Sequence, residues 1–546
     1  MKNCTAMLMV LALGMPVASQ AAGLNSGPIG TRLPGSVLED SDDRGVVSYC
    51  TLPTPPERKV ARPLVNALIT VGETEPNNSQ GAADAIPLGF GVGQDVAVDV
   101  TGTLTSGDQD WFNFNLNAGD ILGVNRIGGG FNLSLFTPAG AFQMGSNTDA
   151  SFIYPPASPL PGGGNRALAF VAPTTGNYAL RLLSGTGAYT TQFRVFRPVL
   201  EGQEIFNKQI LFLDFDGATV NAQALFGQGN TNAVLSPLSS FLAGWGLSGQ
   251  QNAVIDAILA AVAENFNDVG MLGNNGNFIV SGVFGEYEIE IRNSRDHADP
   301  FGQPNVSRVI VGGTIAQLGI STIGIAQDID PGNFETTSSA VVLLDLLSAA
   351  STNPNSLNQY PIAIGASKID LVGVGVGNIV AHEAGHFYGN FHTSNASANQ
   401  NIMDQGGNLA NLVGVGPDGI WGTADDVDVD FGVDNFANEG FTGQEDTLNV
   451  IAFGLSTGTL CDVLVISNAS FPLSVNGTYT MTGMLNGKPF YNFNDNNLWW
   501  TNANYWNLHD DNEQRFTHSS DTPFPPASGW LKMPQNTPDP MTVVCQ

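Results

Sequence analysis

Three of the six histidines in this chain lie within eleven residues, in the stretch VAHEAGHFYGNFHTS at residues 380–394. His382 and His386 are four residues apart, so on a helix they project from one face, one turn apart. Two imidazoles need this spacing to bind a single zinc ion. Glu383 lies beside them and can reach a water molecule without occupying the metal, as a general base does in the H-E-x-x-H arrangement. The spacing therefore predicts a helix that carries a hydrolytic zinc site.

The pattern continues past this predicted helix to Gly389 and His392. Glycine tolerates a positive φ, so it can end the helix and return the chain toward the metal. We expect His392 to be the third ligand, which leaves one zinc position open for water or a substrate carbonyl. Such an open position is typical of catalytic zinc, whereas structural zinc sites are closed by four protein ligands. The alternative is a helix that carries histidines without a metal, and the five matched positions disfavour it.

The extended motif H-E-x-x-H-x-x-G-x-x-H resembles that of the metzincin zinc endopeptidases. In this family a methionine turn follows the motif, and here NIMDQGG supplies Met403, eleven residues after His392. The resemblance implies that Met403 supports the zinc site from below without coordinating it, and that the reaction is hydrolysis of a peptide bond. Some metzincins carry a catalytic tyrosine two residues after the methionine, where this chain has Gln405. No tyrosine ligand is therefore predicted, and the group that helps to stabilise the oxyanion stays open.

The elements that must position this motif have a mixed α/β pattern over residues 205–460. The runs QILFLDFDGATV, NFIVSGVF, YEIEIRN and SRVIVGG predict strands. Apolar residues at helical spacing in GQQNAVIDAILAAVAENFNDVG predict a helix, and TTSSAVVLLDLLSAAS, with Thr and Ser available as caps, is interpreted as another. We expect an α/β (α+β) zincin domain of the metzincin type.

Residues 73–198 show short runs of period-two apolarity between glycine and asparagine turns, a pattern typical of a β-sandwich. The elements ETEPNNSQGAADAIPLG, GDQDWFNFNLNAGD and GNYALRL resemble the bacterial pre-peptidase C-terminal (PPC) domain, an accessory module of secreted proteases. Asp108 and Asp110 could bind calcium, as in some relatives, or could equally be turn residues. Trp111 is expected in the core.

The chain ends in a predicted small β module, residues 461–546, where Asn-Gly pairs between alternating runs predict hairpins. Its aromatic residues could form a platform for a glycan or a protein, or the core of the module. These residues are Trp499, Trp500, Tyr505, Trp506 and Trp530. His297, His509 and His518 have no motif spacing, and no metal is assigned to them.

The net charge of −30 argues against nucleic acid or an anionic membrane as a partner. Oxygen-rich, turn-rich loops suit calcium, although the spacing in GPDGIWGTADDVDVDFGVDNF is not that of an EF-hand. The alternative is a solvated loop with aspartates at turn positions. The candidate calcium ligands are Asp418, Asp425, Asp426, Asp428, Asp430 and Asp434.

The N-terminus has the layout of a secretory signal peptide over residues 1–22, followed by a prosegment or linker at 23–72. No later apolar run is long enough to span a bilayer. Of the three cysteines that remain, Cys461 and Cys545 are the favoured disulfide pair. Cys50 could be a latency switch for the zinc, but a disulfide or a spare thiol is favoured.

Together these features predict a secreted, multidomain zinc metalloendopeptidase: a zincin catalytic domain between an N-terminal β-sandwich and a C-terminal β module. Its expected partner is a protein or peptide substrate, with possible matrix or glycan contact through the β modules. Two alternatives stay open: a non-catalytic secreted adhesion or matrix-binding protein with a structural zinc site, and an amidase acting on a non-peptide substrate.

Overall fold

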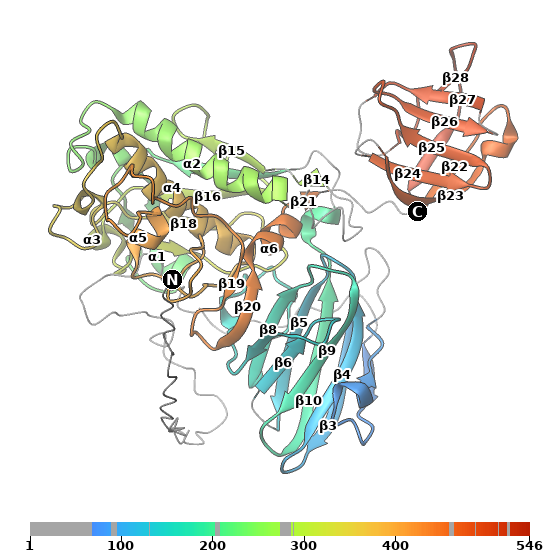
Figure 1. The fold of residues 1–546 in the computed structure, drawn as a ribbon, viewed down its shortest axis with the longest axis horizontal. Coiled ribbons are helices and arrows are strands. Elements are labelled where there is room, and N and C mark those ends of the chain that lie inside the picture. Colours follow the sequence, from blue (N-terminus) through green and yellow to red (C-terminus); the bar gives the residue numbers. More distant parts are fainter. Residues whose placement is uncertain are drawn as a thin grey trace, which may run out of the picture. The chain divides into compact units, whose positions relative to one another are not determined.

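A computed structural model describes ten stretches of the chain (Figure 1). They are residues 68–88, 96–129, 132–202, 208–272, 286–287, 289–457, 463–485, 488–510, 513–520 and 525–545. The predicted signal peptide, almost all of the predicted prosegment, the strand predicted at NFIVSGVF, Cys50 and Cys461 lie outside the described residues, as does the side chain of Cys545. The chain is multidomain and mostly β-sheet with few helices. Among the described residues, no helix combines the length and the apolar character needed to cross a bilayer.

The first part of the described chain is a β-sandwich whose alternating residues point into one core. One sheet has the order β1-β3-β10-β5-β8, with the bounds Ile69–Gly72, Val96–Leu104, Gly187–Phe196, Ile121–Gly128 and Arg166–Val171. The runs VAVDVTGTL and GNYALRL form β3 and β9, as their period-two pattern predicts. Phe193 of this sheet packs edge-on against Phe112 and Phe114 of the facing sheet, at ring-centroid distances of 6.2 and 5.7 Å.

The facing sheet is completed by strands that come from much later in the chain. Its order is β19-β20-β7-β6-β9-β4-β2, with the bounds Val433–Asn435, Phe441–Asp446, Phe142–Ser146, Asn132–Phe136, Gly176–Leu183, Gln109–Leu116 and Asp84–Ala85. One hydrophobic cluster runs from Ile86 of the sandwich segment to Leu455. The sandwich and the segment that follows it therefore share a core, which the division at residues 198–205 did not anticipate.

The segment with the histidine motif is built on a mixed sheet of order β15-β11-β16-β18-β17. The bounds are Ile289–Asn293, Gln209–Asp214, Val306–Val311, Ser339–Val342 and Gly324–Ala326. The first four strands are parallel, and β17 pairs antiparallel with β18 at one edge. The helix predicted in TTSSAVVLLDLLSAAS is wrong, because the apolar run forms the fully buried strand β18. A strand buried on both faces lacks the alternation of apolar and polar residues, so its sequence cannot be distinguished from that of a buried helix by periodicity.

Two long helices pack against each other in this segment, α2 (Gln251–Leu272) and α4 (Lys368–Phe387). Helix α4 begins after Ser367, whose side chain accepts the N–H groups of the next turn. A Cβ atom at Gly377 would lie 2.6 Å from the Cβ of Ala261, so the two backbones approach closely only because glycine stands there. The close approach sets the position of α4, which carries the first two histidines. Shorter helices complete the segment: α1 (Ala222–Phe226), α3 (Ile315–Leu318), α5 (Leu409–Val413) and α6 (Thr447–Gly454).

The C-terminal part is a single nine-stranded sheet, ordered β29-β28-β27-β26-β25-β24-β23-β22-β30. The bounds are Thr537–Pro538, Leu531–Lys532, Glu513–His518, Trp506–Asp510, Asn496–Trp500, Lys488–Phe493, Gly477–Leu485, Val463–Ser467 and Thr542–Cys545. It has its own core, in which Trp500, Trp506 and Trp530 are buried. Trp499 and Tyr505 are half-buried, and Trp499 packs edge-to-face against His509. The five aromatic residues therefore do not form one platform, because three of them fill the core.

The contact between α2 and α4 gives a stability test. We expect Gly377→Val to lower the free energy of unfolding by about 1–3 kcal/mol, because the added side chain collides with Ala261. Adding Ala261→Gly should recover part of the loss, whereas Gly81→Val, where a Cβ meets nothing within 4 Å, should lack the collision. Chemical denaturation followed by circular dichroism measures all three. Equal stability of Gly377→Val and the native chain would show that the helices separate freely.

Candidate metal centre

The structure brings together the three histidines that the sequence predicts as ligands. His382 and His386 lie one turn apart on α4, and His392 follows the turn at Gly389. The ring centroids are 5.0 Å apart for His382 and His386, 5.3 Å for His382 and His392, and 5.0 Å for His386 and His392. Each residue offers one ring nitrogen, and these nitrogens lie within 4.8 Å of one another. Glu383 is buried on the same helix, next to His382.

Hydrogen bonds hold the Nδ1 atom of every one of these histidines. His382 Nδ1 lies 2.6 Å from the carbonyl oxygen of Ile402, and His386 Nδ1 lies 2.7 Å from that of Asn390. His392 Nδ1 lies 3.0 Å from Oε1 of Glu439. A carbonyl or a carboxylate can only accept, so each Nδ1 carries the proton and each Nε2 keeps its lone pair for a metal. Nε2 of His392 is buried and has no hydrogen-bond partner among the described residues, which fits a metal ligand.

The burial of the site also favours the protonation state that a metal needs. Burial, together with the neighbouring His392, lowers the pKa of His382 to about 3. The same two causes lower the pKa of His386 well below its ordinary value. Because removing an imidazolium from water costs more than removing a neutral imidazole, both rings are neutral at pH 7. Neutral imidazole is the form that binds zinc.

Met403 lies against the helix that carries His382 and His386. It is fully buried, and a Cβ atom at Gly385 would come within 2.5 Å of its Sδ. The sulfur therefore packs against α4 between the two histidines, at a place where only glycine leaves room. The backbone of this turn pairs with the segment after His392, since Thr393 N–H donates to the Met403 carbonyl at 2.7 Å. Gln405 is half-buried and pairs through its backbone with Thr393.

Gly389 turns the chain with a φ of +110°. A Cβ atom at this position would lie 2.6 Å from Cα of Pro331, so the turn is also pressed against a neighbouring loop. The same loop donates the N–H of Asp330 to the carbonyl of His386 at 3.0 Å, which caps the end of α4. The glycine is needed for its conformation and for its size, and both determine where His392 lies.

The sequence did not identify Glu439 or Glu445, two carboxylates that contact the end of the motif. Glu439 accepts from His392, and both oxygens of Glu445 lie 3.1 Å from the N–H of Phe391. Burial raises the pKa of Glu445 well above its ordinary value. Both residues lie more than forty positions after the motif, with no spacing that relates them to it. Only the pairing of strands brings them there, so no sequence signal could have found them.

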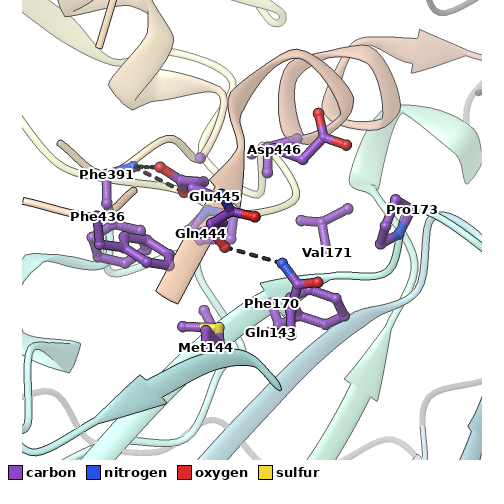
Figure 2. A pocket seen from close by; sticks show the side chains of 14 residues that line it. Gln143, Met144, Phe170, Val171, Pro173, Phe391, Phe436, Gln444, Glu445 and Asp446 are labelled. Carbon is purple, nitrogen blue, oxygen red and sulfur yellow. Dashed lines mark hydrogen bonds between the residues drawn. The ribbon is translucent and has the colours of Figure 1, made fainter. Parts of the chain in front are cut away.

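A small cavity of about 20 Å³ lies beside the end of the motif (Figure 2). Phe391, Glu445 and Met144 are among the residues that line it, whereas Glu383 and the three histidines are not. This volume accommodates roughly one water molecule. The cavity is therefore not a site for a peptide substrate.

The six aspartates predicted to bind calcium do not come together. Asp425 and Asp426 accept backbone N–H groups of their own loop: Asp418 N–H at 3.2 Å, and Gly416 and Gly422 N–H at 3.1 and 2.6 Å. Asp434 accepts from the Ser397 hydroxyl at 2.9 Å. These contacts match the alternative of aspartates at turn positions. Asp428 and Asp430 instead lie with Glu264 of α2, with carboxylate oxygens within 4.8 Å of one another.

A further acidic group lies in the sandwich and includes Asp108 and Asp110. One oxygen each of Glu75, Asp108 and Asp110 lie within 4.8 Å of one another. Oδ1 of Asp110 and Oδ1 of the nearby Asn77 are buried and have no hydrogen-bond partner among the described residues. Burial, followed by the hydrogen bond with Glu73, raises the pKa of Asp110 to about 7. Asp108 also serves as a turn residue, since Thr105 N–H donates to it at 3.2 Å.

Trp111 lies in the core, as expected. It packs against Phe136 at a ring-centroid distance of 4.7 Å. His297, His509 and His518 belong to no group of three possible metal ligands among the described residues.

Comparison with known proteins does not assign a function to this chain. No family model and no curated protein matches the chain. A lysozyme inhibitor of g-type lysozyme, PliG from Aeromonas hydrophila, shares 14% identity at a TM-score of 0.15, over 24% of this chain and 100% of its own. The pre-peptidase C-terminal domain of a collagenase from Bacillus anthracis shares 17% identity at a TM-score of 0.14, over 24% of this chain and 97% of its own.

The turn before the third histidine gives a second prediction. We expect Gly389→Ala to cost about 2–5 kcal/mol of stability, because it adds strain at positive φ to a collision with Pro331. Gly419→Ala is the matched control: its φ is +69° and a Cβ meets nothing within 4 Å, so it should cost only about 1–2 kcal/mol. The free energy of unfolding is measured by chemical denaturation. Equal losses in the two variants would show that the contact with Pro331 adds nothing to the cost of Gly389→Ala.

Proposed function

We propose that this protein is a secreted zinc-dependent metalloendopeptidase of the metzincin type. One observation carries the proposal: three buried histidines have their Nδ1 atoms held by acceptors and offer converging ring nitrogens, with Glu383 next to a ligand on the same helix. The imidazole donor set, the neutral state of His382 and His386, and the unpartnered Nε2 of His392 all fit zinc. Met403 lies beneath the ligand helix, where the resemblance to metzincins expects it.

The proposed roles follow from the chemistry of the residues. Nε2 of His382, His386 and His392 would hold the zinc, which when bound supplies Lewis acidity toward water and a substrate carbonyl. Glu383 takes a proton from the attacking water and delivers it to the amide nitrogen as the C–N bond breaks. The buried surroundings of Glu383 strengthen its electrostatic interaction with a charged partner. The products are a carboxylic acid and an amine.

The ligand count favours an enzyme over a binding protein with structural zinc. The histidine group has three members, and among the described residues no cysteine or carboxylate completes it as a fourth ligand. A structural zinc site has four protein ligands, whereas a catalytic site keeps one position open. Glu383 would also have no task in a structural site. Peptide and other amide substrates place the same demands on these residues, so a peptide library distinguishes an endopeptidase from an amidase.

The general base gives a direct test of the proposed function. We expect Glu383→Gln to keep one zinc per chain and to lose about 10²–10⁴ in peptide hydrolysis, because the amide cannot take the proton. Glu513→Gln is the control, since its side chain is 68% exposed in another part of the chain. Zinc is measured by elemental analysis, and cleavage by mass spectrometry of a peptide library with and without 1,10-phenanthroline. Undiminished cleavage by Glu383→Gln would refute the assignment, and zinc without chelator-sensitive cleavage would favour the binding protein.

We also propose that the sandwich binds calcium, through Glu75, Asp108 and Asp110. The buried oxygens of Asp110 and Asn77 support this proposal because oxygen ligands suit calcium and buried polar atoms need partners. The aspartates of the later loop are weaker candidates, with Asp428, Asp430 and Glu264 the one group of three that includes them among the described residues.

The raised pKa of Asp110 predicts how stability depends on pH without calcium. The folded carboxyl keeps its proton up to about pH 7, whereas the unfolded one releases it near 3.8. The folded state binds more protons between these values, so stability should fall as the pH rises from about 4 to 7. Calcium at pH 7.5 should raise the melting temperature, and Asp110→Asn should remove both effects. If calcium added to calcium-free protein at pH 7.5 left the melting temperature unchanged, the proposal would be contradicted.

A further inference from the structure

The β19–β20 hairpin, residues 433–446, contacts the third histidine and the residues on both sides of it. Its Glu439 accepts from Nδ1 of His392, and its Ala437 N–H donates to the carbonyl of His392 at 2.9 Å. Ser394 N–H donates to the carbonyl of Asn435 at 2.9 Å. His392 is therefore held by this hairpin through both its ring and its backbone.

A buried carboxylate of the same hairpin holds the residue that precedes His392. Glu445 is 6% exposed, and both of its oxygens lie 3.1 Å from the N–H of Phe391 (Figure 2). The ring of Phe391 packs against Phe441 and Phe436 of the hairpin, at 4.8 and 6.3 Å between centroids. Because a buried carboxyl group is costly unless its oxygens are hydrogen-bonded, Glu445 favours a backbone position that satisfies it.

The hairpin is not part of the mixed sheet of its own segment, and its strand partner is the sandwich. β20 pairs antiparallel with β7, with Phe441 opposite Ser146 and Gly443 opposite Met144. Figure 2 shows Gln143 of β7 donating to the carbonyl of Gln444, at 3.0 Å. Asn147 N–H adds a bond of 3.0 Å to the carbonyl of Gly440. The hairpin residues that make these two bonds are Gly440 and Gln444, which are the sequence neighbours of Glu439 and Glu445.

We propose that Glu439 and Glu445 are positioning residues for the third metal ligand, and that the β-sandwich is the frame that holds them in place. The sandwich is then an outer part of the metal centre, and not an independent substrate-binding module. This inference rests on the proposed zinc site and explains which residues fix the position of its third histidine. Glu439 fixes the ring of His392 and increases its basicity, Glu445 fixes the backbone before it, and β7 fixes the strand that carries both.

Two small residues in the paired strands allow the frame to be tested at a distance from the ligands. A Cβ atom at Gly145 of β7 would lie 2.9 Å from Oγ1 of Thr442 and 3.2 Å from the carbonyl oxygen of Leu133. Gly145→Ala should therefore push β20 away from β7, and Thr442→Ala should relieve most of that collision. Gly432→Ala is the matched control just before the hairpin, because a Cβ there meets nothing within 4 Å.

The experiment measures zinc affinity by competition with a chromogenic chelator, and the visible absorption of the cobalt-substituted full chain. Glu439→Ala should weaken zinc binding about 10–100-fold, the usual effect of removing an outer-shell partner. Glu439→Gln should recover part of this loss, since its amide oxygen still accepts from Nδ1. Gly145→Ala should weaken zinc several-fold and alter the cobalt spectrum, Gly145→Ala with Thr442→Ala should return toward the native values, and Gly432→Ala should not change them.

Each outcome decides between the inference and the function on which it rests. A native chain that binds no zinc overturns the proposed function itself. Stoichiometric zinc with unchanged affinity in Glu439→Ala overturns the positioning role and leaves the proposed function standing. A loss in Glu439→Ala without any change in Gly145→Ala overturns the role of the sandwich. If Gly145→Ala does not fold, Gln143→Ala, which removes only the bond to Gln444, takes its place with the same expected direction.

Discussion

The proposed metal centre depends on one constraint: each of the three motif histidines must present Nε2, so each Nδ1 must donate to a fixed acceptor. The three acceptors come from three separate parts of the chain, the turn that precedes Met403, the turn after Gly389, and the β19–β20 hairpin. A wrong tautomer at any one ring would turn an N–H toward the metal position. Burial adds to this constraint by keeping His382 and His386 neutral. The conformation of each of these three segments is therefore part of the site.

Close packing gives these segments their precision. Helix α4 can lie against α2 because glycine stands at its contact with Ala261, and Met403 can lie under α4 because Gly385 leaves room for its sulfur. A side chain of any size at either glycine would move the helix or the methionine, and with them an acceptor or a ligand. The glycines in VGVGVGNIVAHEAGH thus have a packing role that is distinct from the turn at Gly389. Their small size sets distances, whereas Gly389 sets a direction.

What could be predicted from the sequence was local. Helical spacing predicted that His382 and His386 share one face, and the glycine three residues later predicted a turn that returns His392 toward them. Both predictions depend only on residues that are close in the sequence. Glu439 and Glu445 could not be found, since they reach the motif only through strand pairing. The helix expected in residues 336–351 failed because a doubly buried strand has no alternation to reveal it. The six aspartates do not form one site, and two of them, Asp425 and Asp426, already accept backbone N–H groups of their own loop.

The sandwich and the motif-bearing segment resist separation for a physical reason. Without β20, strand β7 would present an unpaired edge, and the apolar residues of the shared cluster would face water. Without β7, the hairpin would lose its strand partner and depend on its contacts with the motif alone. The pairing therefore closes the edge of β7 and also provides the hairpin with a strand partner. Independent modules would instead be joined only by a linker. A strand contributed so late in the sequence also means that the sandwich sheet is complete only after the histidine motif has been synthesised and folded back. The edge strands of this sheet and the surroundings of His392 are therefore formed by the same hairpin.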